Sequence, residues 1–250
     1  MGLFDFFSKT KGDKKVESSP KKGEKEIARL AKLASAKLAQ NYDRQEAIEE
    51  LSRLGSAEAA AALLRRFDWM MEPSITDQEE KEAAMRGVVN AGEAALDPIR
   101  EYCRKAESLT WPLKTLREIV PLESFTEELL GVLDLFDTEY VRNPEPKIQL
   151  IAMLEEFHTD EVRVAVEPFV TDASEPVRFA AVTTIFAVGM PDSVSALIAA
   201  LEEEESLRVK NRIAQGLSER SWKVPAELCA SCDKSLPPGF GMDGELVRRN

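Results

Sequence analysis

The two residues with the clearest capacity for chemistry are Cys229 and Cys232, which are separated by two positions. A Cys-x-x-Cys pair can form a reversible disulfide or supply half of a zinc site, which needs four ligands. The other candidate ligands are a distant Cys103, which falls on the apolar stripe of its predicted helix, and the single histidine, His158. We therefore predict no metal site and no cofactor. Cys229 and Cys232 are interpreted as small residues that end a capping helix, with a redox role or metal capture between two chains as the alternative.

A catalytic set is not apparent in the sequence. His158 precedes Thr159 and Asp160, a combination typical of a helix start, and no second histidine or reactive Ser or Cys lies nearby in sequence. We find no phosphate-cradling glycine loop, Ser-His-Asp arrangement or HExxH motif. We therefore expect a protein that is not an enzyme.

The charge of the chain indicates the kind of partner. The formal net charge is −12 and the pI is near 4.8, which argues against nonspecific binding to nucleic acid. Residues 1–25 hold seven lysines and four acids, so the acidity belongs to the rest of the chain. We expect the partner to be another protein with a basic surface patch.

A run of four acids, Glu202, Glu203, Glu204 and Glu205, follows a predicted helix. Acids at a helix C-terminus are unfavourable by about 0.3–1 kcal/mol each, because they face the negative end of the helix dipole. This placement makes the run a candidate for binding a basic partner. A solvated loop explains the run equally well.

The N-terminus combines an apolar cluster, Leu3, Phe4, Phe6 and Phe7, with a Lys-rich segment up to residue 23. One interpretation is a tip that packs loosely on the body or stays disordered, on a flexible linker. The other is an element that touches a membrane surface or a partner, since an apolar face with nearby lysines suits anionic lipid. We find no spanning segment and no signal peptide, and only three cysteines in the chain, so we expect a cytoplasmic protein.

Apolar periodicity predicts helices through most of the chain. Residues 24–40 form a strong predicted helix whose apolar face includes Ile27, Leu30, Ala31, Ala34 and Leu38. An acidic loop is expected around residues 70–80. Residues 236–250 contain Pro-Pro-Gly and Asp-Gly and predict an extended tail or a small hairpin.

An internal repeat organises the predicted helices. After Gly189, apolar residues stand at +5, +8, +9 and +12, and the same four offsets follow Gly55. Each glycine ends one helix, and a second amphipathic helix follows. Because two such helices cannot bury both apolar stripes alone, the copies must stack.

The segment ASEPVRFAAVTTIFAVGMPDSVSALIAAL resembles the HEAT-like repeats, in the short version of phycobilin-lyase-type proteins. Val177-Arg178 stands where that pattern has its early Val-Arg pair, and Gly189 and Pro191 form its Gly-x-Pro turn. In a later copy, Val209-Lys210 replaces the pair. The resemblance implies an α-solenoid that binds other proteins, and Arg178 either orders a neighbouring turn or contacts a ligand. No catalytic set of the chromophore lyases can be placed here.

The sequence therefore predicts an all-α protein, an α-solenoid of about five or six HEAT-like hairpins in residues 24–235. Residues 1–23 form the tip and linker, and residues 236–250 form the tail. The predicted function is a protein–protein interaction scaffold or regulatory adaptor with an acidic surface. A peripheral membrane adaptor is the first alternative, and a lyase or chaperone for a cofactor-bearing protein is the second.

Overall fold

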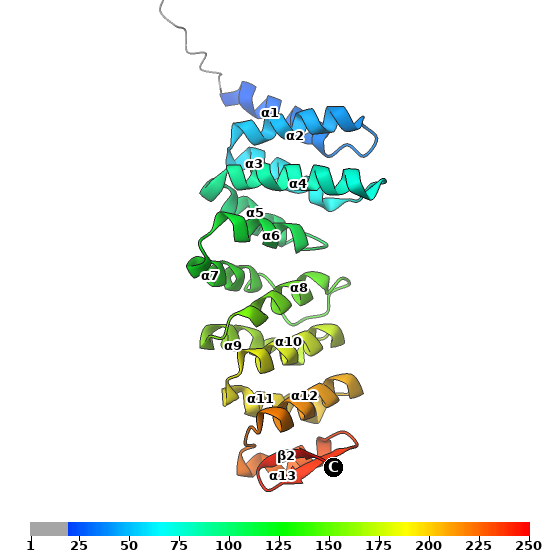
Figure 1. Ribbon diagram of the computed structural model, residues 1–250, viewed down its shortest axis with the longest axis vertical. Coiled ribbons are helices and arrows are strands. Elements are labelled where there is room, and N and C mark those ends of the chain that lie inside the picture. Colours follow the sequence, from blue (N-terminus) through cyan, green and yellow to red (C-terminus); the bar gives the residue numbers. More distant parts are fainter. Residues whose placement is uncertain (1–19) are drawn as a thin grey trace, which may run out of the picture.

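A computed structural model describes residues 20–250 of the chain as a stack of helices that ends in a β-hairpin (Figure 1). The predicted apolar tip with Leu3, Phe4, Phe6 and Phe7 lies outside the described residues. None of the helices in the described part is long and apolar enough to cross a membrane.

Helical hairpins follow a single first helix, α1 (Pro20–Ala34). The pairs are α2 (Asn41–Leu54) with α3 (Ala57–Leu64), α4 (Ser74–Asn90) with α5 (Leu96–Cys103), α6 (Thr110–Ile119) with α7 (Leu122–Leu133), α8 (Glu145–Met153) with α9 (Asp160–Val166), α10 (Glu175–Val188) with α11 (Val194–Glu203), and α12 (Leu207–Arg220) with α13 (Cys229–Ser235). Short 3-10 segments adjoin them: η1 (Arg65–Asp68), η2 (Gly92–Ala95), η3 (Leu154–Glu156), η4 (Glu167–Thr171), η5 (Pro191–Ser193) and η6 (Ala226–Leu228). The predicted all-α solenoid of five or six hairpins is confirmed.

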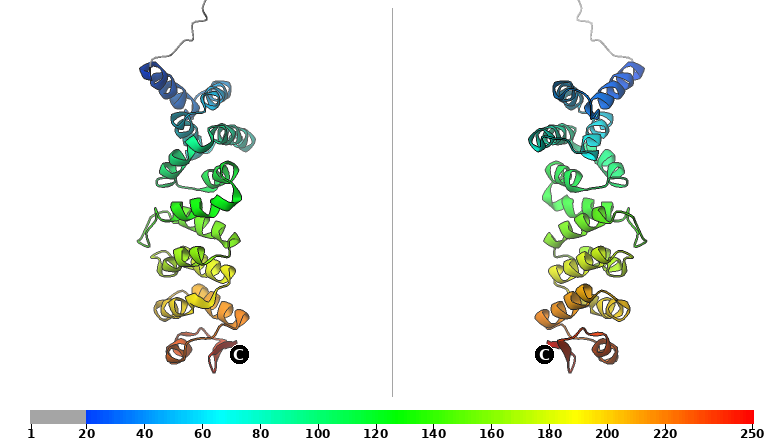
Figure 2. Two further views of the ribbon diagram at one scale, coloured as in Figure 1. Left: turned by 90° about the vertical axis from the view of Figure 1, so that its left-hand side faces the viewer. Right: turned by 90° about the vertical axis from the view of Figure 1, so that its right-hand side faces the viewer.

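The hairpins stack so that like helices meet. First helices pack on first helices, as α2 does on α4 and α10 does on α12, and second helices pack on second helices, as α3 does on α5 and α11 does on α13. The two columns of helices are visible when the stack is turned on its long axis (Figure 2). Each hairpin thus buries its apolar stripes against its neighbours, which is the principle of a repeat array.

The residues whose spacing predicted the repeat form its turns and its buried contacts in the structure. Gly55 and Gly189 end α2 and α10 in the left-handed region, with φ of 58° and 84°, where a side chain would be strained. Of the second-helix anchors, Leu63 and Leu64 of α3 and Leu197 of α11 are fully buried. One backbone feature and one apolar pattern therefore recur in hairpins far apart in the sequence.

The predicted helix over residues 24–40 is wrong at its end. Helix α1 stops at Ala34, and Leu38 is completely exposed. Beyond Ala34 the backbone tightens into a turn, in which the Ala36 N–H donates to the Leu33 carbonyl at 3.1 Å, and the carbonyl of Ala39 accepts from the Arg44 guanidinium. Apolar spacing alone does not show where such a turn begins.

The predicted acidic loop over residues 70–80 is also wrong, because α4 begins at Ser74. Asp77 and Glu80 look like solvent-facing acids in the sequence, but only 7% and 3% of their surfaces are exposed. They lie inside the stack and pair with arginines from the preceding hairpin.

The last residues form an antiparallel hairpin of β1 (Phe240–Asp243) and β2 (Leu246–Arg249). Asp243 pairs with Leu246, so Gly244 (φ 60°) and Glu245 make the turn. Val247 is fully buried, and β2 packs on α12. The hairpin therefore closes the C-terminal end of the stack.

Candidate functional site

The two cysteines with metal spacing lie on α13. Cys229 starts this helix, and its thiol donates to the carbonyl of Pro225 at 3.5 Å. Cys232 is fully buried, and burial raises the pKa of its thiol to about 11. Burial likewise raises the pKa of Cys103, a core residue, to about 12. Within residues 20–250, no three His, Cys, Asp or Glu side chains come together in a group that could hold a metal ion.

His158 lies at the turn before α9, where Thr159 caps the helix by accepting a hydrogen bond from the Val162 N–H at 3.3 Å. The imidazole Nδ1 is 3.4 Å from the carbonyl of Val188. His158 is thus attached to the next hairpin.

The run of four glutamates divides into two kinds of residue. Glu202, Glu203 and Glu205 are exposed. Glu204 is not part of an exposed acidic surface, because it is 7% exposed and accepts hydrogen bonds of 2.7 and 2.8 Å from Arg178. Although burial alone raises the pKa of Glu204, the hydrogen bonds from Arg178 and the backbone outweigh it and hold the pKa below its usual range.

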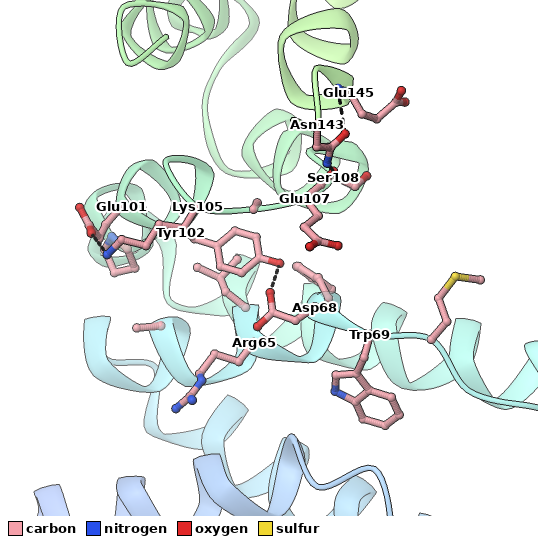
Figure 3. A pocket seen from close by; sticks show the side chains of 16 residues that line it. Arg65, Asp68, Trp69, Glu101, Tyr102, Lys105, Glu107, Ser108, Asn143 and Glu145 are labelled. Carbon is pink, nitrogen blue, oxygen red and sulfur yellow. Dashed lines mark hydrogen bonds and ion pairs between the residues drawn. The ribbon is translucent and has the colours of Figure 1, made fainter. Parts of the chain in front are cut away.

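A hollow of about 1120 Å³ lies on the side of the stack where η1, α5 and the start of α8 meet (Figure 3). We call it the acidic pocket. Its lining comes from three segments that are well separated in the sequence: Ala61, Leu64, Arg65, Phe67, Asp68, Trp69 and Met70; Pro98, Glu101, Tyr102, Lys105, Ala106, Glu107 and Ser108; and Asn143 and Glu145. A volume of this size accommodates several side chains of a bound peptide or a small ligand.

Aromatic residues form much of its apolar lining. Phe67 stacks on Trp111 with ring centroids 5.5 Å apart, and Tyr102 meets Phe67 edge-on at 6.4 Å. The Tyr102 hydroxyl donates to the Asp68 carboxylate at 2.8 Å, which fixes both side chains. Burial and this neighbouring carboxylate raise the pKa of Tyr102, so the phenol stays protonated as a donor.

The polar lining is dominated by acids. The lining contains four acids, Asp68, Glu101, Glu107 and Glu145, and two bases, Arg65 and Lys105. Lys105 pairs with Glu101 at 2.8 Å, so the side chains that remain for a ligand are mainly carboxylates. Figure 3 shows Asp68 and Glu107 turned toward the same opening. This arrangement suits an apolar group with a cation beside it.

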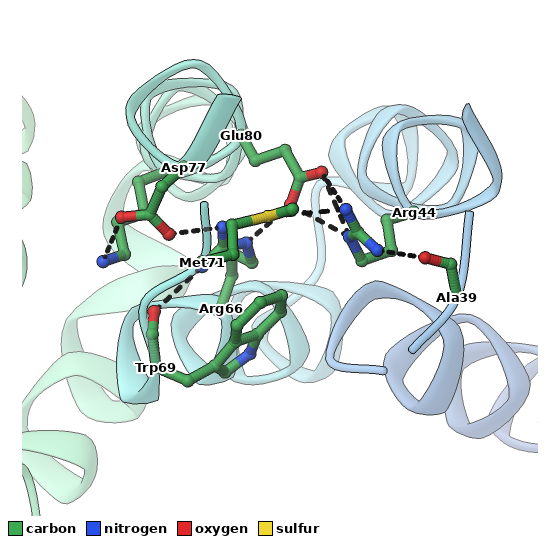
Figure 4. Close-up of polar contacts among 8 residues, drawn as sticks. Ala39, Arg44, Arg66, Trp69, Met71, Asp77 and Glu80 are labelled. Carbon is green, nitrogen blue, oxygen red and sulfur yellow. Dashed lines mark hydrogen bonds and ion pairs between the residues drawn. The ribbon is translucent and has the colours of Figure 1, made fainter. Parts of the chain in front are cut away.

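One wall of the pocket is held in place by a buried network of charges (Figure 4). Glu80 of α4 accepts from Arg44 of α2 at 2.9 Å and from Arg66 of η1 at 2.8 Å. Asp77 accepts from Arg66 at 2.7 Å and from Lys81 at 2.8 Å. All five side chains are at most 10% exposed.

This network reaches the pocket through Trp69. The Arg66 guanidinium lies 3.9 Å from the centre of the Trp69 ring and donates to the Trp69 carbonyl at 3.1 Å. Because Trp69 directly follows η1, these contacts fix the end of that segment and with it Asp68. The position of the pocket's carboxylate therefore depends on charges buried behind it.

Below the pocket, the hairpins become regular. Lys147 of α8 donates to Asp172 at 2.7 Å, and Arg178 of α10 donates to Glu204 and, at 2.9 Å, to the carbonyl of Asp172. A base near the start of each first helix thus holds the loop before the next one. A model of the family described as HEAT repeats matches residues 139–218, which contain both pairs. Residues 139–218, about a third of the chain, are therefore similar to HEAT repeats, and we call them the HEAT-like region.

The HEAT-like region runs from α8 into α12 and contributes Asn143 and Glu145 to the acidic pocket. In this region Arg178 orders the neighbouring turn, one of the two roles expected from the resemblance. Among curated proteins, none matches the chain.

The acidic pocket was not predicted from the sequence. Its carboxylates, Asp68, Glu107 and Glu145, lie in loops or at helix ends, which apolar periodicity does not describe. The signal that was present is a set of aromatic residues, Phe67 and Tyr102, just where predicted helices end.

Proposed function

We propose that the chain is a noncovalent interaction scaffold, and that the acidic pocket binds an apolar segment of a partner protein flanked by lysines or arginines. The observation that supports this most is the combination of three aromatic side chains, Phe67, Trp69 and Tyr102, with four carboxylates in the lining of one hollow. HEAT repeats commonly serve protein–protein interaction, and the pocket lies at their N-terminal border.

The charge of the surrounding chain also favours a basic partner. Residues 26–205 hold 36 acids and 18 bases, so a partner approaching the middle of the stack meets a negative field. Such a field speeds association with a basic partner and loses its effect as salt rises. The affinity itself comes from the apolar contacts, since rim charges contribute mainly to rate and specificity.

This function requires no chemical step, and we propose that the protein is not an enzyme. The three cysteines are free thiols, which supports a cytoplasmic location. The membrane adaptor rests on residues 1–23 and stays a prediction from the sequence.

The test is affinity capture of partners from native lysate with the full chain and with the double variant Asp68→Lys/Glu107→Lys, at low and at high salt. We expect one dominant protein with the wild type at low salt, at least about tenfold less at high salt, and its loss with the variant.

The matched control is Glu123→Lys/Glu127→Lys, which makes the same charge change at exposed positions on α7 outside the pocket. Retention of the partner by this control assigns binding to the pocket. Equal loss in both variants would mean that only net charge matters, and equal retention would remove the pocket from the function.

A further inference from the structure

The C-terminal end of the chain has the opposite charge to its middle. Residues 206–250 hold eight lysines and arginines against five acids. Several of these bases lie on α12 and on β2, which packs against it. A surface of this sign does not fit the basic partner of the acidic pocket.

Arg212 of α12 is the most unusual of these bases. Its guanidinium lies 5.1 Å from the centre of the Phe186 ring, and its Nε donates to the Thr183 hydroxyl at 3.3 Å. It forms no ion pair with any residue that the structure describes. The close packing beneath it requires Gly216, because a Cβ there would lie 2.3 Å from the Phe186 ring.

A hollow of about 280 Å³ opens beside this guanidinium, and we call it the Arg212 pocket. It is lined by Glu155, Thr183, Phe186, Ala187, Arg212, Gly216, Glu219 and Arg220. The Glu219 carboxylate accepts a hydrogen bond from Gln215 at 2.7 Å. Burial lowers the pKa of Arg212, and the charges of Glu219 and Glu155 do not offset this.

A half-buried guanidinium without an ionic partner retains donors that a carboxylate can accept from in bidentate fashion. The Phe186 face holds the guanidinium plane in place, so less freedom is lost on binding. Glu155 and Glu219 repel a dianion more strongly than a monoanion, which favours a carboxylate over a phosphate. The chemistry of the site thus matches an Asp or Glu side chain.

We propose that the Arg212 pocket binds an aspartate or glutamate side chain of an acidic peptide segment in a second partner protein. A further arginine, Arg249, lines a hollow of about 330 Å³ with Asn211, Gln215 and Ser218 of α12. A peptide that crosses α12 can therefore place acids near both arginines. This site is independent of the acidic pocket, and the two together let the stack join a basic and an acidic partner.

The experiment selects binders from a library of random displayed peptides of a dozen residues against the full chain. We expect acid-rich peptides among those recovered, and at least about tenfold weaker binding of them by Arg212→Gln, since a charged bidentate pair is lost. Arg212→Lys keeps the positive charge but loses the paired N–H donors of the guanidinium, so it is expected to rescue binding only in part. Arg86→Gln removes an exposed arginine of α4 and is the matched control.

Two further readouts do not depend on a destabilised variant. Replacing the acids of a recovered peptide by their amides abolishes binding to the wild type. The Trp222 ring packs against the Phe186 ring at a tilt of 33°, with ring centroids 5.2 Å apart, so its ¹⁹F signal in 5-fluorotryptophan-labelled protein shifts when the peptide binds. The proposal is overturned if no acid-rich peptide is recovered, if Arg212→Gln binds such peptides as the wild type does, or if phosphate displaces them better than acetate.

Discussion

Two regions of the stack bury charged side chains in different ways. In the HEAT-like region, buried charges form single pairs between successive hairpins, as Lys147 does with Asp172 and Arg178 with Glu204. In the first two hairpins, five charged side chains form one connected network around Glu80 and Asp77. The single ion pair recurs from one hairpin to the next, whereas the network of five side chains occurs once and supports one local arrangement of helices.

The difference has a structural consequence. The regular pairs tie each first helix to the loop before the next, so neighbouring hairpins stack alike. The network instead joins α2, η1 and α4, and leaves the end of η1 directed toward the acidic pocket. We infer that the acidic pocket is held by a polar network that joins two hairpins, and not by a single ion pair.

The largest effect is expected from Glu80→Gln, which removes the shared acid of Arg44 and Arg66. Loss of one member of a buried ion cluster leaves unpaired charge in the interior, so we expect a loss of about 4–5 kcal/mol in unfolding free energy. Chemical denaturation measures it. Glu79→Gln, an exposed neighbour, is the control, with a change of at most about 0.5 kcal/mol.

Lys147→Met in the HEAT-like region is expected to lower the unfolding free energy by a smaller amount, about 3 kcal/mol. The Asp172 carboxylate left behind still accepts from the Ser174 N–H at 2.8 Å, so it is not wholly unpaired. The same denaturation experiment checks it. Equal costs for this variant and Glu80→Gln would show that the network behaves as a sum of simple pairs.

Gly216→Ala tests the close packing in the C-terminal region. The new methyl group would meet the Phe186 ring at 2.3 Å, so we expect a loss of about 1–3 kcal/mol despite the better helix propensity of alanine. Gly131→Ala on α7, where nothing lies within 4 Å of the added Cβ, is the matched control and should gain up to about 1 kcal/mol. A gain at both positions would contradict the packing of Phe186 on α12.

The smallest effect is expected in how the unfolding free energy changes as the pH is lowered. Burial alone raises the pKa of Asp77, but the hydrogen bonds from Lys81 and Arg66 outweigh it, so the pKa lies below its usual range, as it does for Glu204. A folded-state pKa below the unfolded one contributes stability that is fully present above the unfolded value, near pH 4, and lost as the pH falls through the folded value. Urea unfolding between pH 7 and pH 3 measures it. In Asp77→Asn, the unfolding free energy should fall less steeply as the pH is lowered. An unchanged dependence on pH would show that Asp77 is not ionised in its pair.

The sequence predicted the repeats because their signals are local. Gly189, Leu197 and Ile198 show their turn and their buried face in the sequence itself, and the fold places them accordingly. The acidic pocket could not be predicted in the same way. It depends on ends of helices and on loops, such as the end of η1 at Asp68 and the loop after α5 that holds Glu107. Charged residues in that region also look exposed in sequence, and Arg66 and Glu80 are buried only because they pair with each other.

The most direct test of the scaffold account uses the three tryptophans as reporters. Trp69 lines the acidic pocket, Trp111 stacks on its Phe67, and Trp222 lies at the other end of the stack. We would titrate the full chain labelled with 5-fluorotryptophan with the peptide KKLFLKK and with its acidic counterpart EELFLEE, and follow the ¹⁹F spectrum. If the acidic pocket binds basic apolar segments, the basic peptide shifts the signals of Trp69 and Trp111 but not that of Trp222, and Asp68→Lys/Glu107→Lys abolishes these shifts. Equal shifts with both peptides, or shifts that persist in the variant, would contradict this proposal.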